Sequence, residues 1–188
     1  MTGVLVYVIG PSGAGKDSVL RWARGHAPAG LLVHLARRTI SRPPADPSED
    51  HEAVTPDGFR QLVAAGAFAL HWEANGLGYG IRHEELAALD RGGCVLVNGS
   101  RADLPQARRR YPELAVAFVN ASPAVLRARL LARGRETAEQ IEARLARSVQ
   151  LPLAGAKVDV VIDNDGPLEQ AGERLLRFVE RRCVRTGG

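Results

Sequence analysis

The segment with the clearest chemistry is Gly10–Lys16, which reads Gly-Pro-Ser-Gly-Ala-Gly-Lys. It matches the pattern G-x-x-x-x-G-K, in which glycines let backbone N–H groups surround phosphate oxygens at the start of a helix. The ammonium group of Lys16 would reach the β and γ phosphates of a nucleotide, so Lys16 is also a predicted catalytic residue. The alternative is a chance glycine turn before a surface lysine. The predicted ATP-binding residues here are Gly10, Pro11, Ser12, Gly13, Ala14, Gly15, Lys16, Asp17 and Ser18.

The residue after the lysine of this pattern usually carries a hydroxyl that binds Mg²⁺, and in this chain it is Asp17, followed by Ser18. A carboxylate is also a hard oxygen donor, so Asp17 or Ser18 could hold Mg²⁺ directly or through water. Alternatively, Asp17 only favours the first turn of a helix through the helix dipole. The sequence leaves both roles open.

The positive charge of the chain is carried almost wholly by arginine. Lys and Arg total 25 against 21 Asp and Glu, which gives a net charge of +4, and only Lys16 and Lys157 are lysines. Arginine offers a planar fork that binds phosphate through two parallel hydrogen bonds. Codon bias in a GC-rich genome explains much of the excess, so the arginines have to be sorted by position. The basic balance would allow a nucleic-acid partner, but no recognised motif or interleaved aromatic residues accompany it.

The elements that must position these residues begin with the apolar run Val4–Ile9, which is typical of a buried parallel strand. Residues 16–24 then have helical spacing. Further strands are expected at 95–98, 115–120 and 158–163, alternating with helices at 104–111, 123–133, 138–150 and 168–182. This alternation predicts an α/β fold with a parallel sheet covered on both faces.

The alternation breaks between residues 37 and 85, which predicts an inserted subdomain. Residues 37–56 are too irregular for a long element. Thr55-Pro56 then predicts a capped helix that ends at Gly66, followed by a strand over 67–73. Asn75–Gly80 is expected to be a glycine-rich turn, and residues 84–90 a helix.

The chain of 188 residues predicts one domain without membrane spans, because its apolar runs are far shorter than the ~20 residues of a membrane helix. No leader segment is expected at the N-terminus, since Gly10 and Pro11 interrupt the first apolar run. With only Cys94 and Cys183, no disulfide framework is implied, and the cytoplasm is the expected location. The sequence does not indicate an oligomeric state.

Several segments resemble guanylate kinases and follow the same order as in that family: GPSGAGK, Arg38–Arg42, Gly66–Phe68, the Tyr79-Gly80 pair, and RGR followed by IEARL at Ile141–Leu145. The resemblance covers nearly the whole chain. It implies a P-loop kinase fold with a core at 1–36, 92–132 and 150–188, an acceptor-binding insertion at about 37–91, and a short lid at about 133–149. It also implies that the lid carries arginines, and that Asn164 lies where the family contacts adenine.

The match to guanylate kinase fails where the base should be recognised. The family has a glutamate that accepts hydrogen bonds from guanine, and this position falls at Leu70, which cannot accept one. Sites built on such bonds discriminate by ~10⁴ or more. The tyrosine that contacts the acceptor phosphate in that family falls near His51. The sequence therefore makes GMP a poor candidate for the acceptor.

Other phrases resemble a narrower group, the ribose 1,5-bisphosphate phosphokinases of phosphonate degradation. They are GPSGAGKDS, SEDH at Ser48–His51, WEANGLGYG at Trp72–Gly80 and VNGSRADLPQARRRY at Val97–Tyr111. This resemblance implies transfer of the ATP γ-phosphoryl group to ribose 1,5-bisphosphate, giving 5-phosphoribosyl 1-diphosphate. The alternatives are a guanylate kinase with unusual base contacts and a related binding module that has lost catalysis.

A sugar with two phosphates needs several cations and few apolar base contacts. Ligands of open α/β sheets bind beyond the carboxyl ends of strands, where the segment Asn98–Arg101 begins. Mobile lid arginines would neutralise charge around the transferred group, so Arg133 and Arg144 are predicted catalytic residues, with Arg133 and Asn164 at the ATP. Each arginine could instead be a solvated surface side chain. The predicted substrate-binding residues are Arg38, Arg42, His51, Tyr79, Asn98, Ser100, Arg101 and Arg135.

Overall fold

The computed structural model describes residues 3–43, 50–134, 137–150 and 157–184, apart from the side chains of 144, 147–150 and 184. Its main sheet has five strands: β1 (Val4–Ile9), β2 (Val33–Leu35), β7 (Cys94–Asn98), β8 (Ala115–Asn120) and β9 (Val160–Asp163). Their spatial order is β2-β7-β1-β8-β9, and every neighbouring pair is parallel. The predicted α/β fold with a parallel sheet is confirmed.

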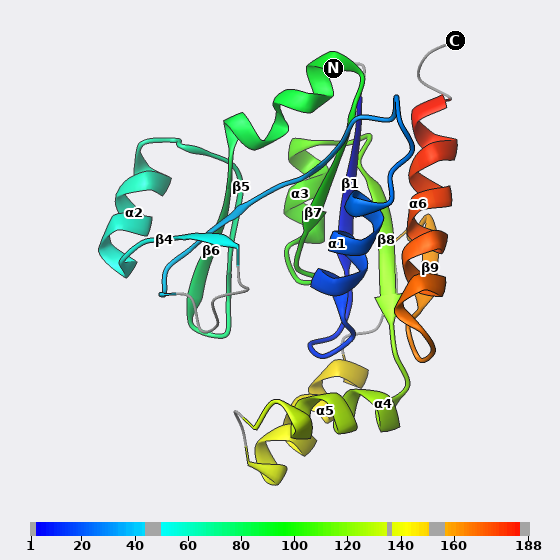
Figure 1. Cartoon of the computed structure of the whole chain (residues 1–188). Coiled ribbons are helices and arrows are strands. Elements are labelled where there is room, and N and C mark those ends of the chain that lie inside the picture. Colours follow the sequence, from blue (N-terminus) through cyan, green and yellow to red (C-terminus); the bar gives the residue numbers. More distant parts are fainter. Residues whose placement is uncertain (1–2, 44–49, 135–136, 151–156, 185–188) are drawn as a thin grey trace.

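Helices cover both faces of this sheet (Figure 1). The neighbouring helices α1 (Lys16–Gly25) and α6 (Leu168–Val184) lie on one face, and α3 (Leu104–Arg110) lies on the other. Alternate residues of β1 belong to two different buried clusters, one around Val6 and Val8 and the other around Leu5 and Tyr7. Because successive side chains of a strand point to opposite faces, β1 is buried on both.

The α4 helix (Pro123–Ala132) and the α5 helix (Ala138–Gln150) pack against each other beside the end of β1 that leads into α1 (Figure 1). The side chain of Ser122 caps α4 by accepting a hydrogen bond from the Val125 N–H at 3.4 Å. Helix α5 contains most of the segment predicted to be a lid.

The predicted insertion forms its own sheet, with the order β4-β3-β6-β5. The strands are β3 (Arg38–Ile40), β4 (His51–Ala53), β5 (Phe68–Ala74) and β6 (Leu77–Arg82). Helix α2 (Pro56–Ala64) starts as predicted, because the Thr55 hydroxyl accepts a hydrogen bond from the Gly58 N–H at 3.0 Å. The chain returns to the main sheet through η1 (His83–Arg91), which is a 3₁₀ helix.

The prediction of a glycine-rich turn over residues 75–80 is wrong. The turn is confined to Asn75 and Gly76, which have positive φ angles of 53° and 74°, and strand β6 starts at Leu77. A Cβ at Gly78 would lie 2.5 Å from the Phe59 ring, and one at Gly80 would collide with the Phe68 ring. These two glycines therefore admit aromatic rings against a strand instead of turning the chain.

Two expectations drawn from composition can be compared with the structure. None of the described helices is both long enough and apolar enough to cross a membrane. Within the described residues, neither Cys94 nor Cys183 is part of a disulfide.

Candidate active site

The Gly10–Lys16 segment forms the loop between β1 and α1 that its pattern predicts. Gly13 and Gly15 have positive φ angles of 88° and 83°, which residues with a side chain rarely adopt. Gly15 is also the N-cap of α1, and a Cβ there would lie 2.5 Å from Nδ2 of Asn164. The glycines are thus required both by the backbone conformation and by close packing behind the loop.

Lys16 lies folded against this loop. Its Nζ donates hydrogen bonds to the carbonyl oxygens of Gly10 at 2.9 Å and Pro11 at 3.1 Å. Burial lowers the pKa of Lys16 to about 8; the Asp17 carboxylate opposes this shift, and the charges of Arg38, Arg101 and Arg133 add to it. These arginines come from β3, from the segment after β7 and from the end of α4, so the fold brings predicted residues of three segments around Lys16.

Asp17 connects the loop to both predicted acceptor-binding segments. Its Oδ1 accepts a hydrogen bond from Nδ2 of Asn98 at 2.7 Å and forms an ion pair with Arg38 at 3.0 Å. Asn98 is buried at the end of β7, whereas the Asp17 side chain is 57% exposed. The adjacent Ser18 is partly exposed in the first turn of α1.

The Asp17–Ser18 pair suits a magnesium ion that also binds nucleotide phosphates. Among the described residues, no group of three His, Cys, Asp or Glu side chains could hold a metal alone. Mg²⁺ is usually bound by one or two carboxylates together with substrate phosphates and water, and the exposed Asp17 carboxylate is such a donor. The donor set therefore fits a metal shared with ATP.

Three further residues predicted to bind the acceptor are Ser100, Arg101 and Tyr79. Arg101 is half-buried beyond the end of β7, and burial lowers its pKa. Ser100 donates its backbone N–H to the hydroxyl of Tyr7 at 3.1 Å. Tyr79, on β6, is stacked on Trp72 with the ring centroids 5.7 Å apart.

His51 contacts the backbone of the segment that carries Arg42. The Nη1 of Arg42 donates to the carbonyl oxygen of Pro43 at 2.8 Å. His51 is buried in β4, and its Nε2 lies 3.2 Å from the carbonyl oxygen of Arg42. His51 thereby holds the backbone at Arg42, and direct substrate contacts of either residue remain a prediction.

Asn164 lies behind the phosphate-binding loop, where it is buried. Its Nδ2 donates to the carbonyl oxygen of Ala14 at 2.7 Å, and its Oδ1 has no hydrogen-bond partner within the described part of the chain. Arg129 joins this contact, because its Nη2 donates to the carbonyl oxygen of Asn164 at 2.8 Å. Sequence reasoning missed Arg129, because the sequence does not show which face of α4 meets the phosphate-binding loop. Arg127, two positions earlier and on another face, is exposed and pairs with Glu142.

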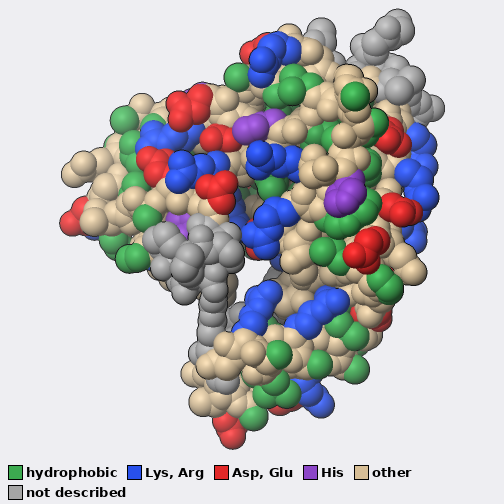
Figure 2. Space-filling view, viewed as in Figure 1, with side chains coloured by type: hydrophobic (Ala, Val, Ile, Leu, Met, Phe, Trp, Pro, Cys, Tyr) green, Lys and Arg blue, Asp and Glu red, His purple; other side chains and the backbone are tan. Residues whose placement is uncertain are grey.

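The lid arginines are only partly described. Arg133 is the exposed C-cap residue of α4. Arg135 lies outside the described residues, as does the side chain of Arg144, whose backbone belongs to α5. Figure 2 shows Lys and Arg side chains gathered around the hollow between the insertion, the main sheet and the α4–α5 pair.

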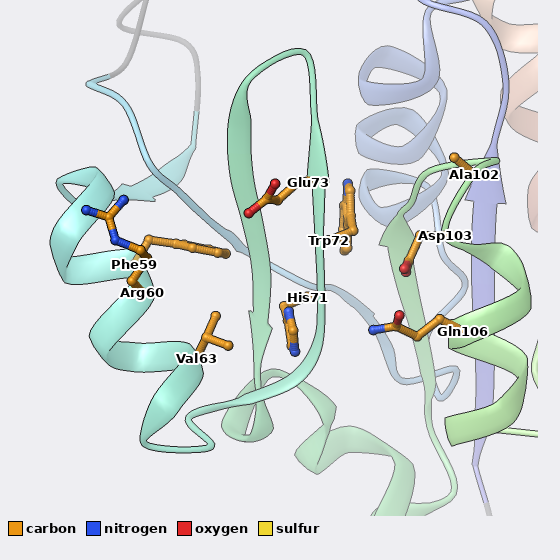
Figure 3. A pocket seen from close by; sticks show the side chains of 9 residues that line it. All are labelled: Phe59, Arg60, Val63, His71, Trp72, Glu73, Ala102, Asp103 and Gln106. Carbon is orange, nitrogen blue, oxygen red and sulfur yellow. The ribbon is translucent and has the colours of Figure 1, made fainter.

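A separate cavity of about 430 Å³ lies between the insertion and the start of α3 (Figure 3). None of its lining residues was a sequence-predicted site residue. They are Phe59, Arg60, Val63, His71, Trp72, Glu73, Ala102, Asp103 and Gln106.

Known proteins resemble this chain over nearly its full length. It is 50% identical over 185 residues to the ribose 1,5-bisphosphate phosphokinase PhnN of Azotobacter vinelandii, covering 97% of this chain and 99% of that protein. It is 48% identical to the protein of the same name from Thiobacillus denitrificans, covering 94% and 93%.

Two further comparisons concern family models and solved structures. No family model matches the chain. The crystal structure of guanylate kinase from Anaplasma phagocytophilum superposes with a TM-score of 0.70 at 18% identity, covering 95% of this chain and 85% of that one. At this identity the likeness shows the fold alone, and it confirms the predicted guanylate-kinase-like fold.

Proposed function

Because the chain belongs to the family of ribose 1,5-bisphosphate phosphokinases, which are ATP-dependent kinases, we propose that it phosphorylates ribose 1,5-bisphosphate to 5-phosphoribosyl 1-diphosphate. The observation that carries this proposal is the gathering of positive charge around the phosphate-binding loop. The charges of Arg38, Arg101 and Arg133 all act on Lys16, although these residues belong to separate elements. Two highly anionic substrates would compensate this concentration of positive charge.

The proposed reaction transfers one phosphoryl group. A terminal oxygen of the 1-phosphate attacks the γ-phosphorus of ATP, and the bond from that phosphorus to the β–γ bridging oxygen breaks, releasing ADP. A phosphate monoester with a second pKa near 6 is largely dianionic at pH 7, so the nucleophile needs no general base. The protein then contributes positioning and charge stabilisation.

On the ATP side, the backbone N–H groups of residues 12–16 are proposed to hold the β and γ phosphates, with Lys16 as the charged partner. Lys16 now donates to two loop carbonyls, and we expect its Nζ to turn to the phosphates when ATP binds. Asn164 is proposed to lie at the adenine, and its Nδ2 holds the carbonyl oxygen of Ala14. Arg133 and Arg144 would neutralise the transferred group as the lid closes.

On the acceptor side, Arg38, Arg42 and Arg101 are proposed to bind the two phosphates of the sugar through bidentate hydrogen bonds. Arg135 would join them from the lid. The smaller polar residues would contact phosphate or sugar hydroxyl groups, and they are His51, Tyr79, Asn98 and Ser100.

Mg²⁺ is proposed to bind between the nucleotide phosphates and the Asp17–Ser18 pair. When bound, it would neutralise negative charge on the ATP phosphates. Asn98 and Arg38 hold the Asp17 carboxylate through its Oδ1, which fixes its orientation at the edge of the loop.

Leu70 supports a sugar phosphate over GMP as the acceptor. It is buried in β5 with 3% of its surface exposed, and its side chain cannot accept a hydrogen bond from a base. The test is an ADP-release assay that offers ribose 1,5-bisphosphate and GMP separately. We expect turnover of ribose 1,5-bisphosphate, and faster turnover of GMP would overturn the proposal.

A catalytically inactive binding module is tested by the Lys16→Ala variant. If the chain is a kinase, this variant should lose phosphoryl transfer while its thermal unfolding remains cooperative. If Lys16→Ala released ADP at the same rate as the unmodified chain, the phosphate-binding loop would not be the catalyst of transfer.

A further inference from the structure

Tyr7 places a hydroxyl group in the otherwise apolar core strand β1. The strand reads VLVYVI, and Tyr7 has no exposed surface. A phenylalanine would fill similar space without a polar atom to satisfy. A buried tyrosine hydroxyl usually needs a hydrogen-bond partner, so its partners indicate what the group does.

Both partners of the Tyr7 hydroxyl lie in the segment that follows β7. The hydroxyl accepts a hydrogen bond from the backbone N–H of Ser100 at 3.1 Å and donates one to Oδ2 of Asp103 at 3.2 Å. Asp103 is the N-cap residue of α3, yet its side chain makes no capping hydrogen bond. Burial raises the pKa of Tyr7, which keeps the hydroxyl protonated as a donor. Tyr7 therefore ties two points on either side of Arg101.

The ring of Tyr7 fixes the same segment by packing. Gly99 approaches it so closely that a Cβ at this position would collide with the ring, and the Gly99 N–H donates to the carbonyl oxygen of Val8 at 2.9 Å. The segment that carries Ser100 and Arg101 thus rests on β1 through the ring, the hydroxyl and the backbone.

The same ring also contacts the insertion. Trp72 of β5 meets Tyr7 edge-on, with centroids 6.4 Å apart and an angle of 76° between the rings, and it stacks on Tyr79 at an angle of 6°. Figure 3 shows Trp72 and Asp103 extending from the insertion and from the start of α3 toward the same cavity. Tyr7 therefore contacts both parts of the chain that are predicted to bind the acceptor, which are the insertion and the segment after β7.

We infer that Tyr7 is a positioning residue for acceptor binding, whose hydroxyl holds the Ser100–Asp103 segment so that Arg101 faces the acceptor phosphates. This inference rests on the proposed function, because it takes ribose 1,5-bisphosphate as the acceptor. Tyr7 acts through Ser100, Asp103 and Arg101 and does not itself touch the substrate.

The test is the Tyr7→Phe variant, which keeps the ring and removes only the hydroxyl. We expect the KM for ribose 1,5-bisphosphate to rise roughly three- to tenfold, as the loss of one or two neutral hydrogen bonds implies, while the KM for ATP stays within about twofold. Tyr111→Phe is the matched control, because this tyrosine lies at the C-cap of α3, outside the predicted site, and both KM values should be unchanged.

Asp103 variants test the same inference independently and decide it if Tyr7→Phe does not fold. Asp103→Ala should raise the acceptor KM, whereas Asp103→Asn keeps an oxygen that can accept the Tyr7 hydroxyl and should restore most of the affinity. In a double-mutant cycle, the acceptor KM of the Tyr7→Phe, Asp103→Ala double variant should be little higher than that of Tyr7→Phe alone.

The outcomes separate this inference from the proposed function. If the unmodified chain does not turn over ribose 1,5-bisphosphate, the proposed function fails and the inference fails with it. If it does, an unchanged acceptor KM in Tyr7→Phe overturns the inference alone. An equal rise in both KM values would also overturn it, because a general structural role would affect both substrates.

Discussion

Lys16 should lose its proton near pH 8 in the nucleotide-free protein, about 2.5 pH units below its ordinary value. The main cause is burial against the phosphate-binding loop, and the nearby charges of Arg38, Arg101 and Arg133 add to it. A shift of this size corresponds to about 3 kcal/mol of unfavourable interaction with the charged amine. At pH 7, roughly one molecule in ten would then carry a neutral Lys16.

The assay is pH-dependent labelling with an amine-reactive acyl reagent, read by peptide mass spectrometry in the absence of Mg²⁺ and nucleotide. Only the neutral amine reacts, so labelling of Lys16 should reach half of its plateau near pH 8. Lys157, the only other lysine of the sequence, is exposed and serves as an internal reference. ATP should protect Lys16 but not Lys157, and Arg133→Gln should move the Lys16 midpoint upward.

The same shift makes stability depend on pH. Between pH 8 and 10.5 the folded chain releases the Lys16 proton before the unfolded chain does, so the unfolded state binds more protons and stability rises with pH. The unfolding free energy of the unmodified chain, taken relative to that of Lys16→Met, should therefore rise across this range by up to about 3 kcal/mol. A labelling midpoint of Lys16 above pH 10 would refute the reasoning.

Three further variants test other contacts. Asp17→Asn should raise the Mg²⁺ concentration for half-maximal rate and change stability by less than about 1 kcal/mol, since the Asp17 side chain is 57% exposed; an unchanged Mg²⁺ titration would leave only the helix-dipole role. Arg129→Gln should raise the KM for ATP about tenfold, because it releases the contact with Asn164. The control Arg127→Gln changes an exposed side chain, and its KM for ATP should stay within about twofold of the unmodified value. Equal KM values for the two variants would contradict this prediction. Gly80→Ala should lower the free energy of unfolding by about 1–3 kcal/mol because its Cβ would collide with Phe68. The control Gly25→Ala meets nothing within 4 Å and should be neutral or slightly stabilising in the same denaturant titration.

Features that depend on neighbouring residues in the chain could be predicted from the sequence. The order of β1, the phosphate-binding loop and α1 follows from an apolar run, three glycines and a helical pattern within about 25 residues. The cap of α2 follows in the same way from Thr55-Pro56, whose hydroxyl lies next to the N–H groups that it satisfies.

Features that depend on distant residues could not be predicted. Gly78 and Gly80 suggested a turn, because glycine is typical of turns, but here they leave room for rings that come from α2 and from the start of β5. In the same way, the sequence does not show which face of α4 meets the phosphate-binding loop. Only the packing of this helix shows that Arg129, and not Arg127 on another face, supports the loop.

The sequence by itself determined the α/β fold, the phosphate-binding loop, the family resemblance and the set of arginines from which the site is built. Only the tertiary structure decided that Arg38 and Asn98 meet at Asp17, that Arg129 and Asn164 support Ala14, and that Tyr7 holds the segment around Arg101. The physical reason is that local patterns reflect interactions over a few residues. Each of these contacts joins groups at least 20 residues apart, whose meeting depends on how the sheets and helices pack.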